Sequence, residues 1–71
     1  MYHYRPVEAT QFYADTGPFL TYGIAVYQGQ QFLFLRPDVF TDRAVVEHIC
    51  RLCTREQVEP IHLEDVIYDC L

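Results

Sequence analysis

The sequence predicts a small α+β domain, a three-stranded antiparallel meander with two C-terminal helices packed on one face of the sheet. Two observations support this class. Over the first 36 residues, aromatic and β-branched side chains alternate between turn signals, which is typical of strands. From residue 42 onward, apolar side chains instead recur at the spacing of amphipathic helices. We expect one domain over residues 1–71.

The composition argues for a small folded domain and against binding to nucleic acid or to an anionic membrane surface. A chain of 71 residues buries roughly 60% of its unfolded surface when it folds. Apolar residues make up 51% of the chain and aromatic residues 15%, which argues against disorder. The net charge is −5, and the 5 basic residues are all arginine and are scattered along the chain. Neither nucleic acid nor an anionic membrane surface is therefore expected as a partner.

The N-terminus and the cysteines predict the cellular setting. No stretch approaches the ~18 apolar residues of a membrane span. The first residues lack the basic and apolar regions of a secretory signal. We therefore expect a cytoplasmic protein whose 3 cysteines, an odd number, are reduced thiols.

The first strand is predicted over residues 2–13. Pro6 has no amide hydrogen to donate to a neighbouring strand. We therefore expect this strand to lie at a sheet edge or to begin after the proline. Asp15-Thr16-Gly17-Pro18 is a turn signal that folds the first strand back beside a second strand at residues 19–27.

The second and third strands form a predicted β-hairpin. The third strand covers residues 31–36 and follows a short connection that contains Gly29. Arg36-Pro37-Asp38 is expected to end this strand, because proline and aspartate are poor strand formers.

Both faces of this hairpin are apolar. Alternation gives one face a mainly aliphatic set, namely Leu20, Tyr22, Ile24, Val26, Leu33 and Leu35. The other face combines small residues with aromatic ones, namely Phe19, Thr21, Gly23, Ala25, Tyr27, Phe32 and Phe34. Each apolar face of a sheet must be buried against other secondary structure or against another molecule.

The two predicted amphipathic helices can bury only one face of the sheet. The first is predicted over residues 42–55, with Thr41 as its N-cap, and the second over residues 62–70, with His62 as its N-cap. Each helix offers a single apolar stripe, and together they suit the aliphatic face. The aromatic face is left without a partner inside the chain.

Two segments carry a resemblance to a known family. Thr21-Tyr22-Gly23-Ile24 and Pro60-Ile61-His62-Leu63-Glu64-Asp65-Val66 resemble short proteins of unknown function from anaerobic Gram-positive bacteria. The resemblance covers roughly residues 20–71, and the C-terminal segment is its more distinctive part. It implies a cytoplasmic bacterial protein and carries over no catalytic residue.

Cys50 and Cys53 form a C-x-x-C, with Cys70, His48 and His62 as further candidate zinc ligands. The pair lies inside a predicted helix beside its apolar stripe, and a second C-x-x-C is missing. Core packing is therefore favoured over a metal site. A redox pair is less favoured still, because such pairs lie at a helix N-terminus, where the dipole lowers the thiol pKa.

The sequence favours a non-enzymatic protein-interaction module without a cofactor. We expect it to form a homodimer, or to bind a protein partner, through the aromatic sheet face or through an edge strand. The expected interface residues are Phe19, Tyr27, Phe32 and Phe34. The alternative is a metal-binding or thiol-dependent protein that uses Cys50, Cys53 and, as a third ligand, Cys70.

Overall fold

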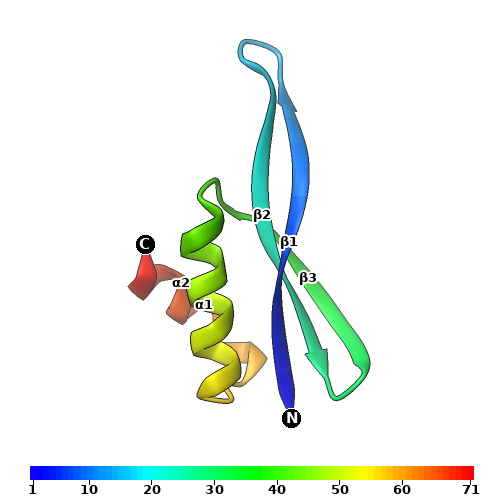
Figure 1. Ribbon diagram of the computed structural model, residues 1–71, viewed down its shortest axis with the longest axis vertical. Helices are drawn as coiled ribbons and strands as arrows, with labels where there is room; N and C mark the ends of the chain where they lie inside the picture. The colour runs from blue at the N-terminus through cyan, green and yellow to red at the C-terminus, as the bar shows by residue number, and fades with distance from the viewer.

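The chain folds into three strands followed by two helices, as a computed structural model describes for residues 1–71 (Figure 1). The elements are β1 (Tyr2–Tyr13), β2 (Gly17–Gln28), β3 (Gln31–Phe40), α1 (Arg43–Arg55), the 3-10 turn η1 (Pro60–His62) and α2 (Leu63–Cys70). The strands form one antiparallel sheet in the order β1-β2-β3, and the helices pack on it. The predicted α+β meander with two C-terminal helices is therefore confirmed.

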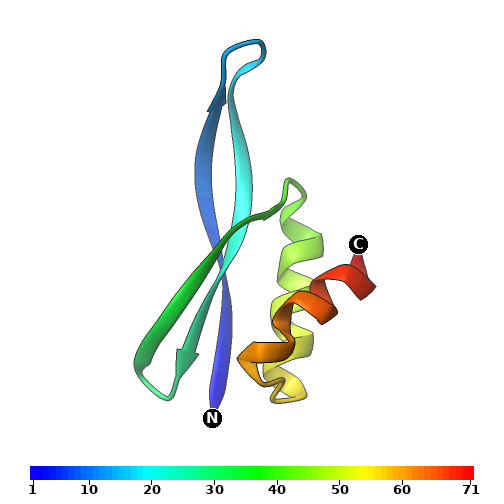
Figure 2. The ribbon, with the colours of Figure 1, turned by 180° about the vertical axis from the view of Figure 1, so that it is seen from behind.

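β1 and β2 form a long ladder without a register shift, from Tyr2 opposite Gln28 to Tyr13 opposite Gly17. Gly17 has a φ of +73°, a conformation that favours glycine, where the chain enters β2 after the turn. The upper part of this ladder projects beyond both helices (Figures 1 and 2). We call residues 8–21 the arm.

β3 pairs with β2 less regularly. Tyr27 lies opposite Phe32, but Val26 lies opposite Phe34, so Leu33 is an extra residue in β3. A second irregularity follows, because Ile24 pairs with Arg36 whereas Tyr22 pairs with Phe40.

This second irregularity corrects the predicted end of the third strand. β3 does not end at Arg36 but continues through a bulge, in which Asp38 has a φ of +52°, and pairs again at Phe40. Pro37 falls in the bulge, where no ladder donor is required. A Cβ on Gly23 would lie 2.6 Å from the carbonyl oxygen of Arg36, so the close approach of the bulge requires glycine.

The helix ends also differ from expectation in one respect. The N-cap of α1 is Asp42 rather than Thr41, and its carboxylate accepts a hydrogen bond from the amide of Ala44 at 2.9 Å. Because α1 begins at Arg43, Thr41 lies one residue too early to cap it. His62 is the N-cap of α2, as predicted, but makes no side-chain capping bond.

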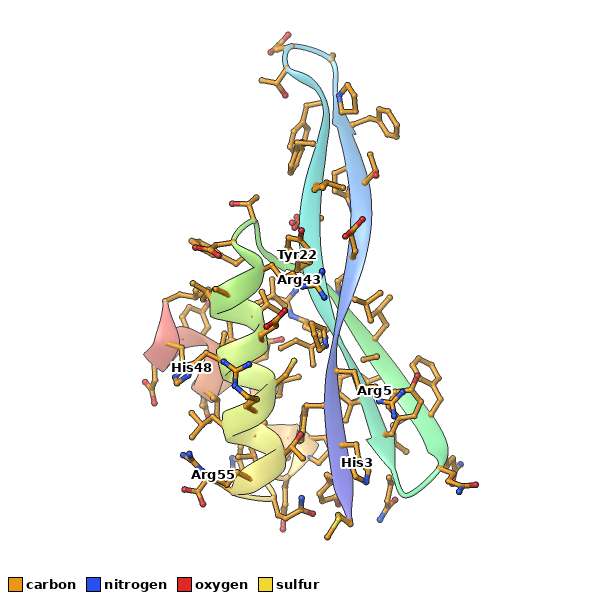
Figure 3. The ribbon with its side chains drawn as sticks, viewed as in Figure 1. His3, Arg5, Tyr22, Arg43, His48 and Arg55 are labelled. Carbon is orange, nitrogen blue, oxygen red and sulfur yellow. The ribbon has the colours of Figure 1, made fainter.

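The core lies between the helices and one face of the sheet. That face carries Ile24 and Val26, both fully buried, as predicted for the aliphatic side. The buried core cluster comprises Tyr4, Ile24, Val26, Val39, Val46, Ile49, Cys50, Cys53, Leu63 and Ile67. We call the opposite face, which carries His3, Arg5 and Tyr27, the open face; Figure 3 shows His3 and Arg5 on the side of β1 away from α1.

Candidate functional site

The C-x-x-C cysteines lie in the core. Cys50 is 3% exposed and Cys53 is fully buried, whereas Cys70 is half-buried at the end of α2. Burial raises the pKa of Cys50 to about 12 and that of Cys53 to about 11. Both thiols therefore stay protonated at neutral pH, and the thiolate is the form that binds metals and attacks substrates.

The two candidate histidine ligands lie away from these thiols. His48 is exposed on α1, and Nδ1 of His62 lies 3.8 Å from a carboxylate oxygen of Asp65. No three or more histidine, cysteine, aspartate and glutamate side chains are grouped so that they could hold a metal ion. The structure thus does not bring the proposed ligands together.

Two of the four predicted interface residues meet on the open face. Tyr27 and Phe32 are opposite each other in the ladder, and their rings pack edge to face with centroids 5.5 Å apart. The guanidinium of Arg5 lies 5.5 Å from the centre of the Tyr27 ring, on the same face. Phe32 remains 54% exposed.

The third predicted residue, Phe34, lies on the other face. The extra residue Leu33 places Phe34 opposite Val26, and two residues later Arg36 points to α2, where it binds Glu64. Strand alternation therefore puts Phe34 on the helix side. Leu35 takes its place on the open face, opposite Ala25, and is 46% exposed. We call Tyr27, Phe32 and Leu35 the open patch.

Phe19, the fourth predicted residue, belongs to the arm. Its ring stacks on that of Tyr13 with centroids 5.0 Å apart. Tyr27 follows Phe19 by eight positions on β2, a distance of about 26 Å at ~3.3 Å per residue. The four predicted residues therefore do not form one continuous patch.

Sequence reasoning missed two exposed apolar residues of the arm, Phe12 and Leu20. Phe12 is 73% exposed, and both side chains point to the helix side, beyond the reach of the helices. Element lengths contain the signal that predicts this exposure. The 13 residues of α1 span about 20 Å at ~1.5 Å per residue. The 12 residues of β1 span about 40 Å at ~3.3 Å per residue, so half of β1 must lie uncovered.

The largest hollow is an open groove of about 720 Å³ between β1 and α1, which we call the β1–α1 groove. Tyr4, Pro6 and Leu52 supply apolar surface. Its remaining lining is mostly polar and includes His48, Arg51, Thr54 and Arg55. Glu47, which also lines the groove, pairs with Arg51 at 3.6 Å and, more closely, with Arg43 outside the groove at 2.6 Å. The groove thus combines apolar surface with two arginine side chains, of which Arg55 pairs loosely with Glu56 at 3.8 Å.

The chain has no helix that is both long and apolar enough to span a membrane. A family model described as a family of unknown function (DUF6514) matches residues 1–71. No curated protein and no solved structure matches the chain. The resemblance to a family of unknown function is thereby confirmed, and it extends over the whole chain.

Proposed function

The chain belongs to the family of unknown function DUF6514, and from that premise we propose that it is a non-enzymatic protein-interaction module that self-associates through the open face. The observation that carries this proposal is the open patch. Phe32 and Leu35 are each about half exposed beside Tyr27, on a face that neither helix covers.

The size and chemistry of the open patch support an interface. A fully buried aromatic side chain removes roughly 150–250 Å² from water, and monomers seldom expose apolar patches beyond a few hundred Å². Aromatic residues and arginine are enriched at protein interfaces, and Arg5 adjoins Tyr27 on the open face.

A second copy of the chain is the simplest partner for this surface. Two-fold symmetry buries the same patch on both copies at once. A domain of 71 residues has a small core, so burial of further apolar surface stabilises it.

The test is the solution mass, measured by light scattering across a dilution series. We expect a mass of at least twice 8.4 kDa that persists on dilution. Phe32→Glu places a charge in the open patch and should weaken association by about 30-fold or more, as for an interface residue worth ~2 kcal/mol. Phe34→Glu is the matched control, because it changes the same residue type on the same strand but on the helix side.

Two results would contradict this proposal. One is a parent protein that is monomeric at every concentration. The other is a Phe32→Glu variant that keeps the parent's mass while its circular dichroism spectrum shows a native fold.

We also propose a cytoplasmic setting in an anaerobic Gram-positive bacterium. The three free thiols, two of them in the core, support a reducing compartment, and the resemblance of residues 20–71 supports the source. Fractionation of cells that produce the tagged protein tests the compartment. Recovery outside the cytoplasm would contradict it.

A further inference from the structure

The backbone amides on the outer edge of β1 have partners before Pro6 and none after it. Before it, the amide of Tyr2 donates to Oε1 of Gln57 at 2.8 Å, and the amide of Tyr4 donates to Oγ1 of Thr54 at 3.0 Å. Pro6 itself has no amide hydrogen. From residue 2 to residue 6, therefore, the edge has no free backbone donor.

Beyond Pro6 the same edge is free. In an antiparallel ladder, the amides of alternate residues point to the same side. Since Tyr2 and Tyr4 donate away from β2, the amides of Glu8, Thr10 and Phe12 also point away from β2. These three residues are exposed, and no hydrogen bond within the chain uses their amides.

The other uncovered edges are interrupted. β2 lacks its β3 neighbour over residues 17–21, but Pro18 stands in this stretch. The outer edge of β3 is broken by the extra residue Leu33 and by the bulge at Pro37. Residues 8–12 of β1 are therefore the one regular run of free donors and acceptors, and a regular free edge is a template for another strand.

We propose that residues 8–12 of β1 pair antiparallel with the same residues of a second copy, around a two-fold axis at Thr10. In this arrangement the arm tip of each copy lies in the β1–α1 groove of the other. This contact uses the edge of the sheet and not its open face, so it goes beyond the association proposed above.

The sequence of the edge is complementary to itself. With the axis at Thr10, the two copies of this residue face each other, and threonine pairs across strands are favourable. Glu8 lies opposite Phe12 of the second copy, so no two like charges meet. A two-fold axis perpendicular to the sheet keeps the helix sides together, which moves Phe12 from solvent toward the flank of the other α1.

The same register brings the arm tip to the groove. Ala14 lies four residues after Thr10, and Pro6 lies four before it, so the turn of one copy passes Pro6 and Tyr4 of the other. Both of these residues line the β1–α1 groove. Asp15 is the only charged residue of the turn, and Arg51 and Arg55 stand along the groove.

A bound arm also fits the physics of small hairpins. A two-stranded ribbon with neither face covered is marginally stable in water. The arm is such a ribbon in a single copy beyond its base, where Thr21 alone is buried. Phe12 and Leu20 are exposed on one side of it and Tyr13 on the other. In the proposed dimer, the arm gains a neighbouring strand from the second copy, and its tip packs in the β1–α1 groove of that copy.

The test is a cysteine cross-link at the proposed axis. Thr10→Cys in a Cys70→Ser background should form a disulfide-linked dimer under mild oxidation, because residues that face each other across strands lie within disulfide range. Cys50 and Cys53 are buried and do not compete. Ala14→Cys in the same background is the control: it is equally exposed, but the proposed register separates its two copies by about 26 Å.

A second variant guards against misfolding. Thr10→Pro removes only an amide that points away from β2, as Pro6 already does on the same strand, so it should retain the native fold and lose the arm contact. The arm proposal is overturned if Thr10→Cys does not cross-link, or if Ala14→Cys cross-links as well. It is likewise overturned if a folded Thr10→Pro variant keeps the parent's mass.

The two proposed contacts fail separately. If Phe32→Glu loses association and Thr10→Cys does not cross-link, the contact through the open face is supported and the arm contact is contradicted. If Thr10→Cys cross-links and Phe32→Glu keeps the parent's mass, the arm contact is supported and the contact through the open face is contradicted. A parent that is monomeric and does not cross-link would remove both.

Discussion

The amide of Tyr4 in β1 donates a hydrogen bond to Oγ1 of Thr54, in the last turn of α1, at 3.0 Å. The side chain of Gln57 makes a similar bridge: Oε1 accepts from the amide of Tyr2, and Nε2 donates to its carbonyl oxygen. The hydroxyl of Tyr4 in turn donates to the carbonyl oxygen of Val58. The end of α1 is thus fastened to the edge of β1, which both orients the helix and closes the lower part of that edge.

Thr54→Val tests this attachment. Valine has nearly the shape of threonine but cannot accept the hydrogen bond, so the partly buried amide of Tyr4 loses its partner. We expect the free energy of unfolding to fall by about 1–2 kcal/mol. For a domain of this size each kcal/mol lowers Tm by about 4–8 °C in thermal unfolding. Thr16→Val, in the exposed turn of the arm, is the control and should leave Tm unchanged.

The cap of α1 gives a second prediction. Asp42→Ala removes the carboxylate that accepts from the amide of Ala44 and should destabilise the protein by about 1 kcal/mol. Thr41→Ala removes the residue that the sequence favoured as the cap and should change little. Urea unfolding of both variants decides between them, and a larger loss for Thr41→Ala would show that the cap is misassigned.

Gly23→Ala probes the bulge in β3. The new Cβ would meet the carbonyl oxygen of Arg36 at 2.6 Å, so the backbone of the bulge must move. We expect a loss of about 2–3 kcal/mol, in the range for overpacking. Gly29→Ala is the comparison: that turn residue has a φ of +60° but open space around it, so only about 1 kcal/mol is expected. Equal losses for the two variants would contradict the close approach.

The buried thiols predict how stability depends on pH. Burial raises the pKa of Cys50 from 9.0 to about 12, so the folded state keeps this proton to higher pH than the unfolded chain does. The stabilisation is complete below pH 9 and should be lost progressively as pH rises toward 12. Burial likewise raises the pKa of Tyr4 to about 12, with the same sign.

The measurement is urea unfolding at pH values from 7 upward. Cys50→Ala should lower stability at pH 7 and make the fall above about pH 9 shallower, because one group with a raised pKa is gone. Cys70→Ala, which removes a thiol that is only half-buried, serves as the control for the loss of a thiol. A parent whose stability is flat between pH 9 and 11 would contradict the burial of these protons.

Part of the candidate site was within reach of the sequence. Tyr27 and Phe32 were expected to share an uncovered sheet face, and they do, because the turn at Gly29 fixes their pairing. Phe34 was assigned to the wrong face, because one extra residue at Leu33 reverses the alternation beyond it. No local pattern in a strand of apolar residues marks which of them is extra, so only its packing on β2 decided this.

The sequence by itself determined the order and type of the elements and the face that the helices cover, because alternation, helical spacing and turn residues act over a few neighbours. The tertiary structure alone decided which edges of the sheet remain open. Gln57 and Thr54 bind the edge of β1 although they lie 55 and 50 residues from their partners Tyr2 and Tyr4 in the sequence. Their hydrogen bonds close the lower part of this edge. The arm is left free because α1 is about half as long as β1, a mismatch that becomes a surface only when the helix docks at one end of the strand.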